Sequence, residues 1–419
     1  MRALFSARLG ADFNRLWTAS AVSNIGDGVT MAAGPLLVAS VSDDPSLIAG
    51  AVFAQQLPCL LIGLISGAWV DRLDRRTTVV VVNLLRAAAL AALTVTIAAG
   101  VVSIPVIYLV VFLLGVGETL ADNAMGAMIP AVVAPEHLQS ANTRLGVTFG
   151  IGNQFVAKPL GTWLFVVSAA VPFGVDALTF AASAALIAGL RPVPPSPAHE
   201  RTSLRREIGA GIRWLGRHRL LRTTAITMGI GNIAFCAAFA VFVLYCRDRL
   251  GLNEVGYGVL LTAFAAGGLL GAGVAARLSR RFGNPALLRA GLIVEVGVHL
   301  TLAVTTSPWV AAAVLVVFSV HTMVWGVLVA TIGQKAVPDH LRGRVSSVYF
   351  LLQTGGAALG SLLGGVLAGV WAVTTPFWAA AVVMVAITVG AWRPLGESRD
   401  PATGSDPASP TAVSEPSAP

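Results

Sequence analysis

Acidic and basic side chains interrupt the long apolar stretches of this 419-residue sequence at a few positions. The acids Asp27, Glu118 and Asp122 and the bases Arg86 and Lys158 all lie well inside such stretches. A charge at the centre of a bilayer costs roughly 2.5–3.5 kcal/mol on insertion scales, so residues of this kind are retained for function or for pairing. A buried carboxyl group can bind a proton in one state of a protein and release it in another. Reversible proton binding is therefore the chemistry that we expect here.

Glu118 and Asp122 are four residues apart, so they share one face of a helix. Two carboxyl groups at this spacing disfavour double ionisation, which suits a site that holds one proton. Asp27 lies near the middle of its apolar stretch and is flanked by glycines. We predict that these three acids handle protons. Two alternatives remain open: a helix–helix hydrogen bond made by a neutral Asp27, and an ion pair of Asp122 with Arg75 or Arg76.

The two intramembrane bases need partners. Lys158 is expected to neutralise Asp27 or Glu118, and Arg86 to meet Asp122. Either pair could equally be structural. We predict that both bases act as counter-charges inside the membrane.

Other polar residues in apolar stretches have simpler explanations. Glu295 and His299 are four apart and can satisfy each other, and Asp176 lies near the end of its stretch. The three cysteines are too few and too scattered for a disulfide framework or a metal site. No metal site and no cofactor are predicted.

Composition places the protein in a membrane. Hydrophobic residues make up 56% of the chain and charged residues 11%, against roughly 25% charged residues in soluble domains. Spanning a bilayer takes about 20 mostly apolar residues. Twelve stretches qualify, and none shows the period-two alternation of a barrel strand. The predicted spans are 16–40, 47–70, 78–100, 105–131, 145–168, 171–190, 222–246, 256–276, 286–305, 309–334, 346–370 and 373–393.

The basic residues give the orientation. Of the 28 Lys and Arg residues, 24 fall in loops on the side of the N-terminus, whereas Arg247 and Arg249 alone occupy the loops of the other side. Cytoplasmic loops of membrane proteins are enriched in Lys and Arg, so both termini are predicted to be cytoplasmic. The same distribution accounts for the net charge of +8 without any nucleic-acid partner.

The organisation expected from these spans has four parts. Residues 1–190 form a first six-helix bundle, 191–221 a cytoplasmic linker, 222–393 a second six-helix bundle and 394–419 a disordered cytoplasmic tail. Within the linker, Leu204, Ile208, Ile212 and Leu215 recur at helical spacing among arginines, a pattern typical of a helix lying on anionic lipid. Membrane lipid is thus one expected partner.

The two halves of the sequence repeat each other. The triplet Ile-Gly-Asp that ends at Asp27 corresponds to Ile-Gly-Asn ending at Asn232, an offset of 205 positions. The Arg-rich loop 72–76 corresponds to 277–281 at the same offset, and 135–138 corresponds to 338–341 at an offset of 203. Parallel internal repeats of this kind are common in transporters. The fold class predicted is an all-α membrane protein of two pseudo-symmetric bundles.

The loop between the second and third spans shows the clearest motif. It contains, in order, Gly63, Gly67, Asp71, Arg72, Arg75 and Arg76. With this loop the chain resembles the major facilitator superfamily, and within it the twelve-span drug:proton antiporters. Asp74 stands where many members of the superfamily have Gly. The resemblance implies that the loop latches the outward-facing state, with Asp71 against the start of span eleven; the alternative is a simple topological anchor.

The resemblance also implies a central cavity lined by spans one, four, seven and ten. Asn24, Asn232, His321 and Trp325 would then contact the substrate. Span five departs from the pattern of the exporters: it reads Ala-Lys-Pro-Leu-Gly-Thr at 157–162, where these exporters have a Gly-Pro-Pro-Leu-Gly-Gly-like stretch.

The function expected from these features is proton-coupled efflux of a lipophilic small molecule across the bacterial inner membrane, by a monomer. Two alternatives stay open on the same fold: export of an endogenous metabolite such as a siderophore, and facilitated uptake. No phosphate-binding Gly-x-x-x-x-Gly-Lys-Ser/Thr motif occurs, so ATP is not the expected energy source. Nor does the sequence show a nucleophile–base set, which argues against a membrane enzyme.

Overall fold

A computed structural model describes residues 9–70, 73–191 and 204–396. All regular structure within these ranges is helical, including one 3-10 turn (η1) and two π-helical segments (η2 and η3). The elements are α2 (Ala11–Val41), α3 (Pro45–Val70), α4 (Arg75–Ala98), α5 (Ile104–Val132), η1 (Pro135–His137), α6 (Leu138–Phe149), η2 (Gly150–Ala157), α7 (Lys158–Val167), α8 (Val171–Ala188), α9 (Leu204–Arg217), α10 (Arg219–Ala240), α11 (Phe242–Leu244), η3 (Tyr245–Arg249), α12 (Glu254–Phe282), α13 (Asn284–Val304), α14 (Pro308–Ala336), α15 (Asp339–Val370) and α16 (Thr375–Gly396).

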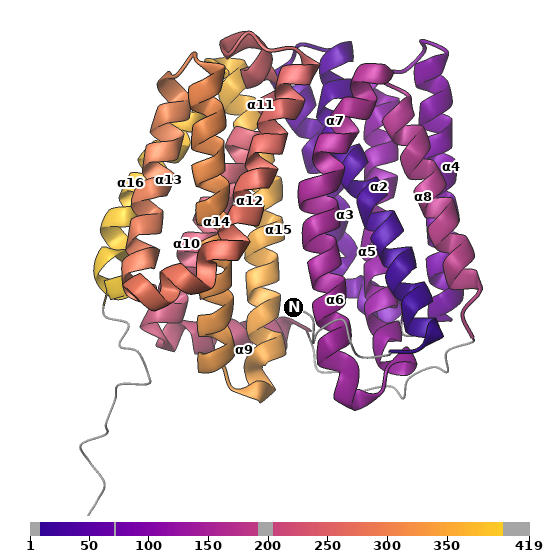
Figure 1. The fold of residues 1–419 in the computed structure, drawn as a ribbon, viewed down its shortest axis with the longest axis horizontal. Helices are drawn as coiled ribbons and strands as arrows, with labels where there is room; N and C mark the ends of the chain where they lie inside the picture. Colours follow the sequence, from indigo (N-terminus) through magenta and orange to yellow (C-terminus); the bar gives the residue numbers. More distant parts are fainter. Residues whose placement is uncertain (1–8, 71–72, 192–203, 397–419) are drawn as a thin grey trace, which may run out of the picture.

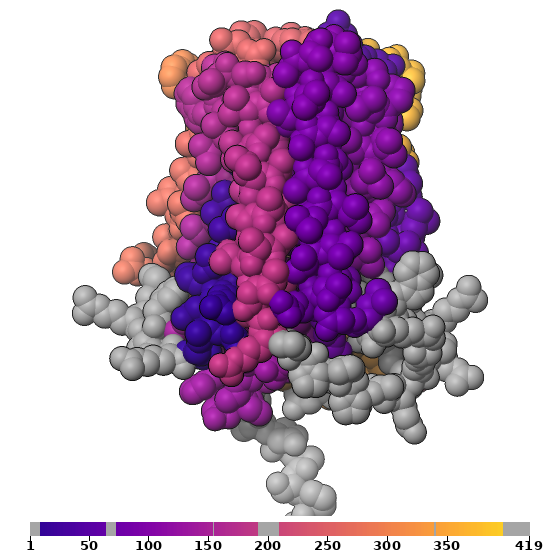
Figure 2. Space-filling view, turned by 90° about the vertical axis from the view of Figure 1, so that its right-hand side faces the viewer, coloured from indigo at the N-terminus to yellow at the C-terminus, as the bar shows by residue number. Residues whose placement is uncertain are grey.

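The helices stand side by side in two groups that follow the order of the chain (Figure 1). Helices α2 to α8 make the first half, at the right of the view, and α10 to α16 make the second half, at the left. In the first half α8 packs against α2 and α4, and α3 packs against α5. Figure 2 shows α8 running the height of the protein between α4 and α2. In the second half the main pairs are α10 with α15, α12 with α14, and α13 with α16.

Ten helices in the described ranges are long and apolar enough to cross a membrane. Two of the twelve predicted spans are not among them. The span 16–40 falls within α2, whose centre contains Ser20, Ser23, Asn24 and Asp27, and these polar residues lower its mean hydropathy. The span 145–168 is divided among α6, η2 and α7, because a π-helical segment interrupts the α-helix. The all-helical membrane fold agrees with the prediction, whereas the count of twelve stays a prediction.

Glycine allows the closest helix contacts. A β-carbon at Gly364 on α15 would lie 2.1 Å from the backbone oxygen of Ala237 on α10, and one at Gly161 on α7 would lie 2.3 Å from that of Val29 on α2. Both distances are far inside van der Waals contact, so no larger residue fits without moving a backbone. Small residues at helix interfaces let backbones approach in this way in membranes.

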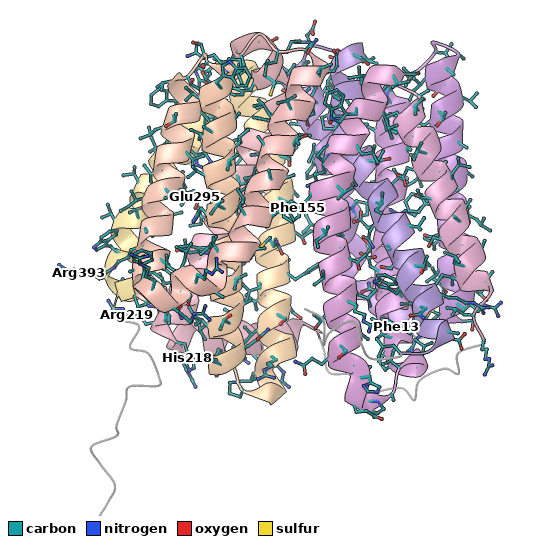
Figure 3. The ribbon with its side chains drawn as sticks, viewed as in Figure 1. Phe13, Phe155, His218, Arg219, Glu295 and Arg393 are labelled. Carbon is teal, nitrogen blue, oxygen red and sulfur yellow. The ribbon has the colours of Figure 1, made fainter. Side chains whose placement is uncertain are left out.

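The two halves meet closely at the end of the molecule opposite the N-terminus. Nη1 of Arg247, in η3, donates to Oδ1 of Asp43, between α2 and α3, at 2.7 Å. Oγ of Ser46 on α3 donates to the backbone oxygen of Gly365 on α15 at 3.5 Å. Nearer mid-height, Phe155 of η2 lies between the halves (Figure 3), with its ring against Gly268 of α12. These contacts close this end.

Helix α9 lies crosswise beneath the second half, at the end where the N-terminus lies (Figure 1). Leu215 is buried there among Leu221, Val345 and Val348, whereas Ile212 is 54% exposed. The linker thus contains the predicted helix, and one face of it packs on α15. Its predicted contact with lipid stays a prediction. At the other boundary α16 continues to Gly396, three residues beyond the predicted end of the second bundle; residues 397–419, the remainder of the predicted tail, lie outside the described ranges.

Candidate functional site

Asp27 on α2 and Arg86 on α4 form an ion pair inside the first half. Nη2 of Arg86 lies 2.5 Å from Oδ1 of Asp27, and the two side chains are 5% and 15% exposed, respectively. The guanidinium group also stacks 3.8 Å from the centroid of the Phe180 ring on α8. The methylene groups of Arg86 fill the space left by Gly117 on α5, where a β-carbon would lie 2.6 Å from Cδ. One arginine thereby ties four helices around Asp27.

The partner of Arg86 differs from the one expected from the sequence. The counter-charge of Asp27 is Arg86, and the pairing of Arg86 with Asp122 is not the one that the structure shows. Nε of Arg86 is buried without a hydrogen-bond partner among the described residues. An unsatisfied buried donor of this kind is energetically unfavourable.

Glu118 and Asp122 line a cavity of about 580 Å³ between the two halves. Both come from α5, with Glu118 half-buried and Asp122 exposed to the cavity, as their spacing on one helix face predicts. The remaining walls come from α2, α3 and α15. The other lining residues are Met31, Gln55, Gln56, Cys59, Gly63, Gly115, Thr119, Asn123, Ser346, Ser347, Phe350 and Thr354. One side of this cavity is therefore acidic and rich in amides.

A second cavity, of about 540 Å³, adjoins the first. It lies between α14 and the first half of α15, and it shares Ser346 and Phe350 with the first cavity. Its lining is largely apolar and includes Val329, Val337 and Tyr349. The parts of α14 and α15 that line these cavities, within 326–337 and 342–354, lie toward the end of the molecule where the N-terminus lies (Figure 1). The first cavity thus has an acidic wall, and the adjoining second cavity has an apolar wall.

Asp176 on α8 is a further buried acid that sequence reasoning set aside. Its carboxylate accepts hydrogen bonds from Oγ1 of Thr30 at 2.6 Å and from Oγ1 of Thr179 at 2.9 Å, and the residue is 0% exposed. It packs against Gly26, the neighbour of Asp27. The sequence signal was present, since an Asp stands in an apolar span. It was discounted because position 176 lies near the start of that span.

Polar contacts also join α2 to the π-helical segment η2. Nδ2 of Asn153 donates to the backbone oxygen of Asn24 at 2.9 Å, and Gly28 packs directly on Asn153 and Ala157. Lys158, the first residue of α7, follows this segment and is half-buried. The irregular part of span five is therefore placed one turn from Asp27. Pro159, which follows this segment, is the sequence signal for a break in the helix, because proline cannot donate the backbone hydrogen bond of a regular helix.

The four residues predicted to line the substrate cavity, Asn24, Asn232, His321 and Trp325, make contacts within and between helices. Nδ2 of Asn232 donates to the backbone oxygen of Gln353 on α15 at 2.6 Å, so this side chain joins two helices. Asn24 donates to the backbone oxygen of Ser20 at 2.7 Å. His321 and Trp325 contact each other and face α13. None of the four lines either cavity described above, and their contact with substrate stays a prediction.

The loop motif is described only in part. Asp71 and Arg72 lie outside the described residues, so the latch stays a prediction. Asp74, the departure from the superfamily pattern, caps α4: Oδ1 accepts from the backbone nitrogen of Thr77 at 2.6 Å. Hydrogen bonding from Thr77 lowers the pKa of the Asp74 carboxyl. An Asp here is accordingly explained by helix capping.

The remaining residues of the motif tie the start of α4 to its neighbours. Nη1 of Arg75 donates to the backbone oxygen of Ala127 on α5 at 2.9 Å, and Arg76 donates to that of Ala188 on α8. Gly63 faces α5, where its β-carbon would meet Cγ2 of Thr119 at 3.8 Å, and Gly67 belongs to the same helix, α3.

A family model described as "transmembrane secretion effector", within the major facilitator superfamily, matches residues 6–411. The chain belongs to this family. The superfamily predicted from the loop motif is thereby confirmed, and so is the prediction that the protein is a transporter and no enzyme.

The transporter also resembles characterised relatives over most of its length. It is 30% identical over 389 residues to the multidrug efflux pump Tap of Mycolicibacterium fortuitum, covering 88% of this chain and 92% of that pump. It is 24% identical over 390 residues to the multidrug efflux pump Tap of Mycobacterium tuberculosis, covering 88% and 89%.

Solved structures of transporters share the fold. The nucleoside transporter NupG matches with a TM-score of 0.70 at 12% identity, over 94% of this chain and all of that one. A bacterial homologue of the iron transporter ferroportin in its inward-facing state matches with a TM-score of 0.66 at 18% identity, over 90% of this chain and 98% of that one. At such identities the likeness concerns the fold alone.

Proposed function

We propose that this transporter exports lipophilic small molecules, neutral or cationic, in exchange for protons. The observation that supports the proposal best is the buried Asp27–Arg86 pair beside two further acids, Glu118 and Asp122, on the wall of a cavity between the halves. The relative named as a multidrug efflux pump at 30% identity supports the direction and the class of substrate.

The acids suit proton exchange because their surroundings change when the cavity opens or closes. A carboxylate that loses contact with water is stabilised when it binds a proton or a cation. Without either of them, the buried negative charge is unfavourable. In the described conformation Asp122 and Glu118 face the cavity, whereas Asp27 holds Arg86. A cationic substrate and a proton therefore compete for the carboxyl groups of Glu118 and Asp122. This competition couples substrate transport to proton transport.

The two cavity walls suit an amphiphilic molecule. A cationic group of the substrate would face Glu118 and Asp122, and an apolar part would face Tyr349, Phe350 and the valines of α14. Aromatic and aliphatic walls with a few placed polar groups are usual in small-molecule sites.

The positive-inside rule gives the orientation of the protein in the membrane. The orientation in turn gives the side of the membrane toward which the cavities open. If the basic N-terminal side faces the cytoplasm, the cavities open toward the cytoplasm and the closed end lies outside. Substrate then enters from the cytoplasm or the inner leaflet of the bacterial cell membrane. We propose a single chain as the working unit, in contact with membrane lipid.

The proton gradient supplies enough free energy for such export. One charge crossing 100 mV yields about 2.3 kcal/mol, and a tenfold proton ratio adds about 1.4 kcal/mol. One proton per cycle thus supports accumulation of a neutral substrate outside by several hundred-fold, on the order of 10^2.7.

Efflux by cells tests the proposal. A bacterial host without its own drug pumps, expressing this protein, is expected to extrude ethidium and to lose that ability when a protonophore is added. Glu136→Gln, which neutralises an exposed acid outside the cavities, is the matched control and should behave as the unmodified protein. Extrusion that continues undiminished after the protonophore collapses the gradient contradicts proton coupling, and uptake of ethidium against its gradient contradicts export.

Alternating access requires that the closed end opens, and a disulfide across it tests this step. A β-carbon at position 369 would lie 3.1 Å from Oγ of Ser46, and a disulfide places each Cβ about 3 Å from the far sulfur. Ser46→Cys with Gly369→Cys, in a chain whose three native cysteines are replaced by Ser, is expected to lose over 90% of ethidium efflux on oxidation and to regain it on reduction. Each single cysteine variant is the control. Full efflux by the oxidised, cross-linked protein contradicts an opening at this end.

A further inference from the structure

A second buried pair of titratable groups lies in the second half of the protein. Nε2 of His321 on α14 lies 3.5 Å from Oε2 of Glu295 on α13, and the two side chains are 9% and 12% exposed. Figure 3 places Glu295 at mid-height of the second half. The sequence pattern paired Glu295 with His299 instead. In the structure Nδ1 of His299 contacts the backbone oxygen of Glu295 at 2.8 Å, which leaves the carboxyl group to His321.

The surroundings of the pair are built to hold it. A β-carbon at Gly291 on α13 would lie 2.5 Å from Cε1 of His321, so only glycine admits the imidazole there. The Trp325 ring lies edge-on to His321 with a centroid distance of 5.8 Å. The carboxyl group of Glu295 reaches α10, where a β-carbon at Gly231 would lie 3.5 Å from its Oε1.

Among the described residues the ion-pair contact of each group is with the other. Gly231 on α10 faces the Glu295 carboxyl group, Met384 on α16 packs against Gly231, and Gly271 on α12 packs on α14. His299 on α13 is the remaining titratable neighbour, and its contact is with backbone. Glu295 and His321 are accordingly each other's ionisable partner at this site.

The internal repeat relates this site to the acids of the first half. At the offset of 203, Glu118 corresponds to His321 and Asp122 corresponds to Trp325. At the offset of 205, Gly26 corresponds to Gly231. Each of these glycines has a buried carboxyl group against it.

In the first half the carboxyl group belongs to Asp176, and in the second half to Glu295. The second half thus keeps a buried acid beside its first helix but replaces the acid of α5 with a histidine on α14.

We propose that Glu295 and His321 form a second proton-binding site, so that each cycle moves two protons, one through each half of the molecule. This inference rests on the proposed function. With one proton the pair is neutral overall, whether the proton sits on Nε2 or on the carboxyl group. Removal of that proton leaves a buried carboxylate without a counter-charge, and a second proton leaves a lone imidazolium; burial disfavours both.

Access to the pair comes from the apolar cavity. Gly326, next to Trp325, lines that cavity on α14, and Met228, one turn before Gly231, lines it on α10. The pair therefore lies just beyond the deep end of the cavity. A shift of α14 against α10 admits water to Glu295, which then stands as a solvated carboxylate and releases the proton.

Steady-state accumulation in proteoliposomes measures the number of protons. With the membrane potential clamped at zero by valinomycin and equal potassium, a proton ratio of ten drives ethidium to about 100-fold accumulation if two protons exchange and to about 10-fold if one does. We expect about 100-fold for the unmodified protein and for His299→Gln, and about 10-fold for Glu295→Gln and for His321→Gln. Glu295→Asp, which keeps the carboxyl group, should give a ratio between about 10 and about 100.

The outcomes separate the two proposals. A ratio of about 10 for the unmodified protein, or about 100 for both Gln variants, overturns the second proton site while leaving proton-coupled export intact. No response of ethidium to the proton ratio in the unmodified protein contradicts the proposed function itself. Should the Gln variants fail to fold, as judged by thermal unfolding in detergent, Glu295→Asp takes their place: a ratio between about 10 and about 100 supports the site, and an unchanged ratio of about 100, or a ratio of about 10 for the unmodified protein in repeat measurements, overturns it.

Discussion

Replacement of Arg86 by Leu is expected to lower the free energy of unfolding by about 3 kcal/mol, because it leaves the Asp27 carboxylate buried without its partner. The 2.5 Å ion pair, the stacking on Phe180 and the packing against Gly117 are all lost together. The midpoint of thermal unfolding in detergent should fall by several degrees. Arg393→Leu removes the same charge at an exposed position and should change stability by no more than about 0.5 kcal/mol.

The double variant Asp27→Asn with Arg86→Leu identifies the cause of that loss. Because neither charge remains, it should be more stable than Arg86→Leu alone, as is usual when both partners of a buried pair are replaced. Proton-coupled efflux should nevertheless be absent in the double variant, since Asp27→Asn removes the carboxyl group that binds the proton in the proposed mechanism. If the double variant is no more stable than Arg86→Leu, Arg86 stabilises the protein through packing. Neutralising the charge of Asp27 would then not be its contribution to stability.

The sequence predicted the class of structure, and it singled out the candidate site residues for a physical reason. Charges in apolar stretches are costly, so the few that occur stand out. Asp27, Glu118 and Asp122 were found in this way, and the four-residue spacing correctly placed the last two on one face of α5, lining one cavity.

The partners of these residues could not be predicted. Arg86 meets Asp27 because α4 lies against α5 and α8, around α2, and the order of spans along the chain does not fix which faces touch. The same limit explains Glu295, whose neighbour along the helix is His299 but whose carboxyl group meets His321 on another helix.

Position along a span misled the treatment of Asp176. A position near the end of a span gives an acid less weight, yet Asp176 is fully buried and accepts hydrogen bonds from Thr30 and Thr179. Likewise, hydropathy treated residues 145–168 as one uniform helix, whereas a π-helical segment places Asn153 against Asn24. Pro159, just after this segment, cannot donate a backbone hydrogen bond, so the break has a sequence signal that hydropathy does not register.

The central claim is that acids in the first half exchange protons for substrate, and everted membrane vesicles test it most directly. In vesicles whose lumen has been acidified by respiration, ethidium entering through the protein should drive protons out, which a pH-sensitive dye reports as partial loss of the gradient. Asp27→Asn and Glu118→Gln are each expected to abolish this ethidium-driven proton release, with ethidium binding retained by purified Asp27→Asn, whose substituted residue lies outside the cavity lining. The Glu136→Gln control should release protons as the unmodified protein does. Full proton release by both Asp27→Asn and Glu118→Gln would contradict the account, because the transported proton would then use neither acid.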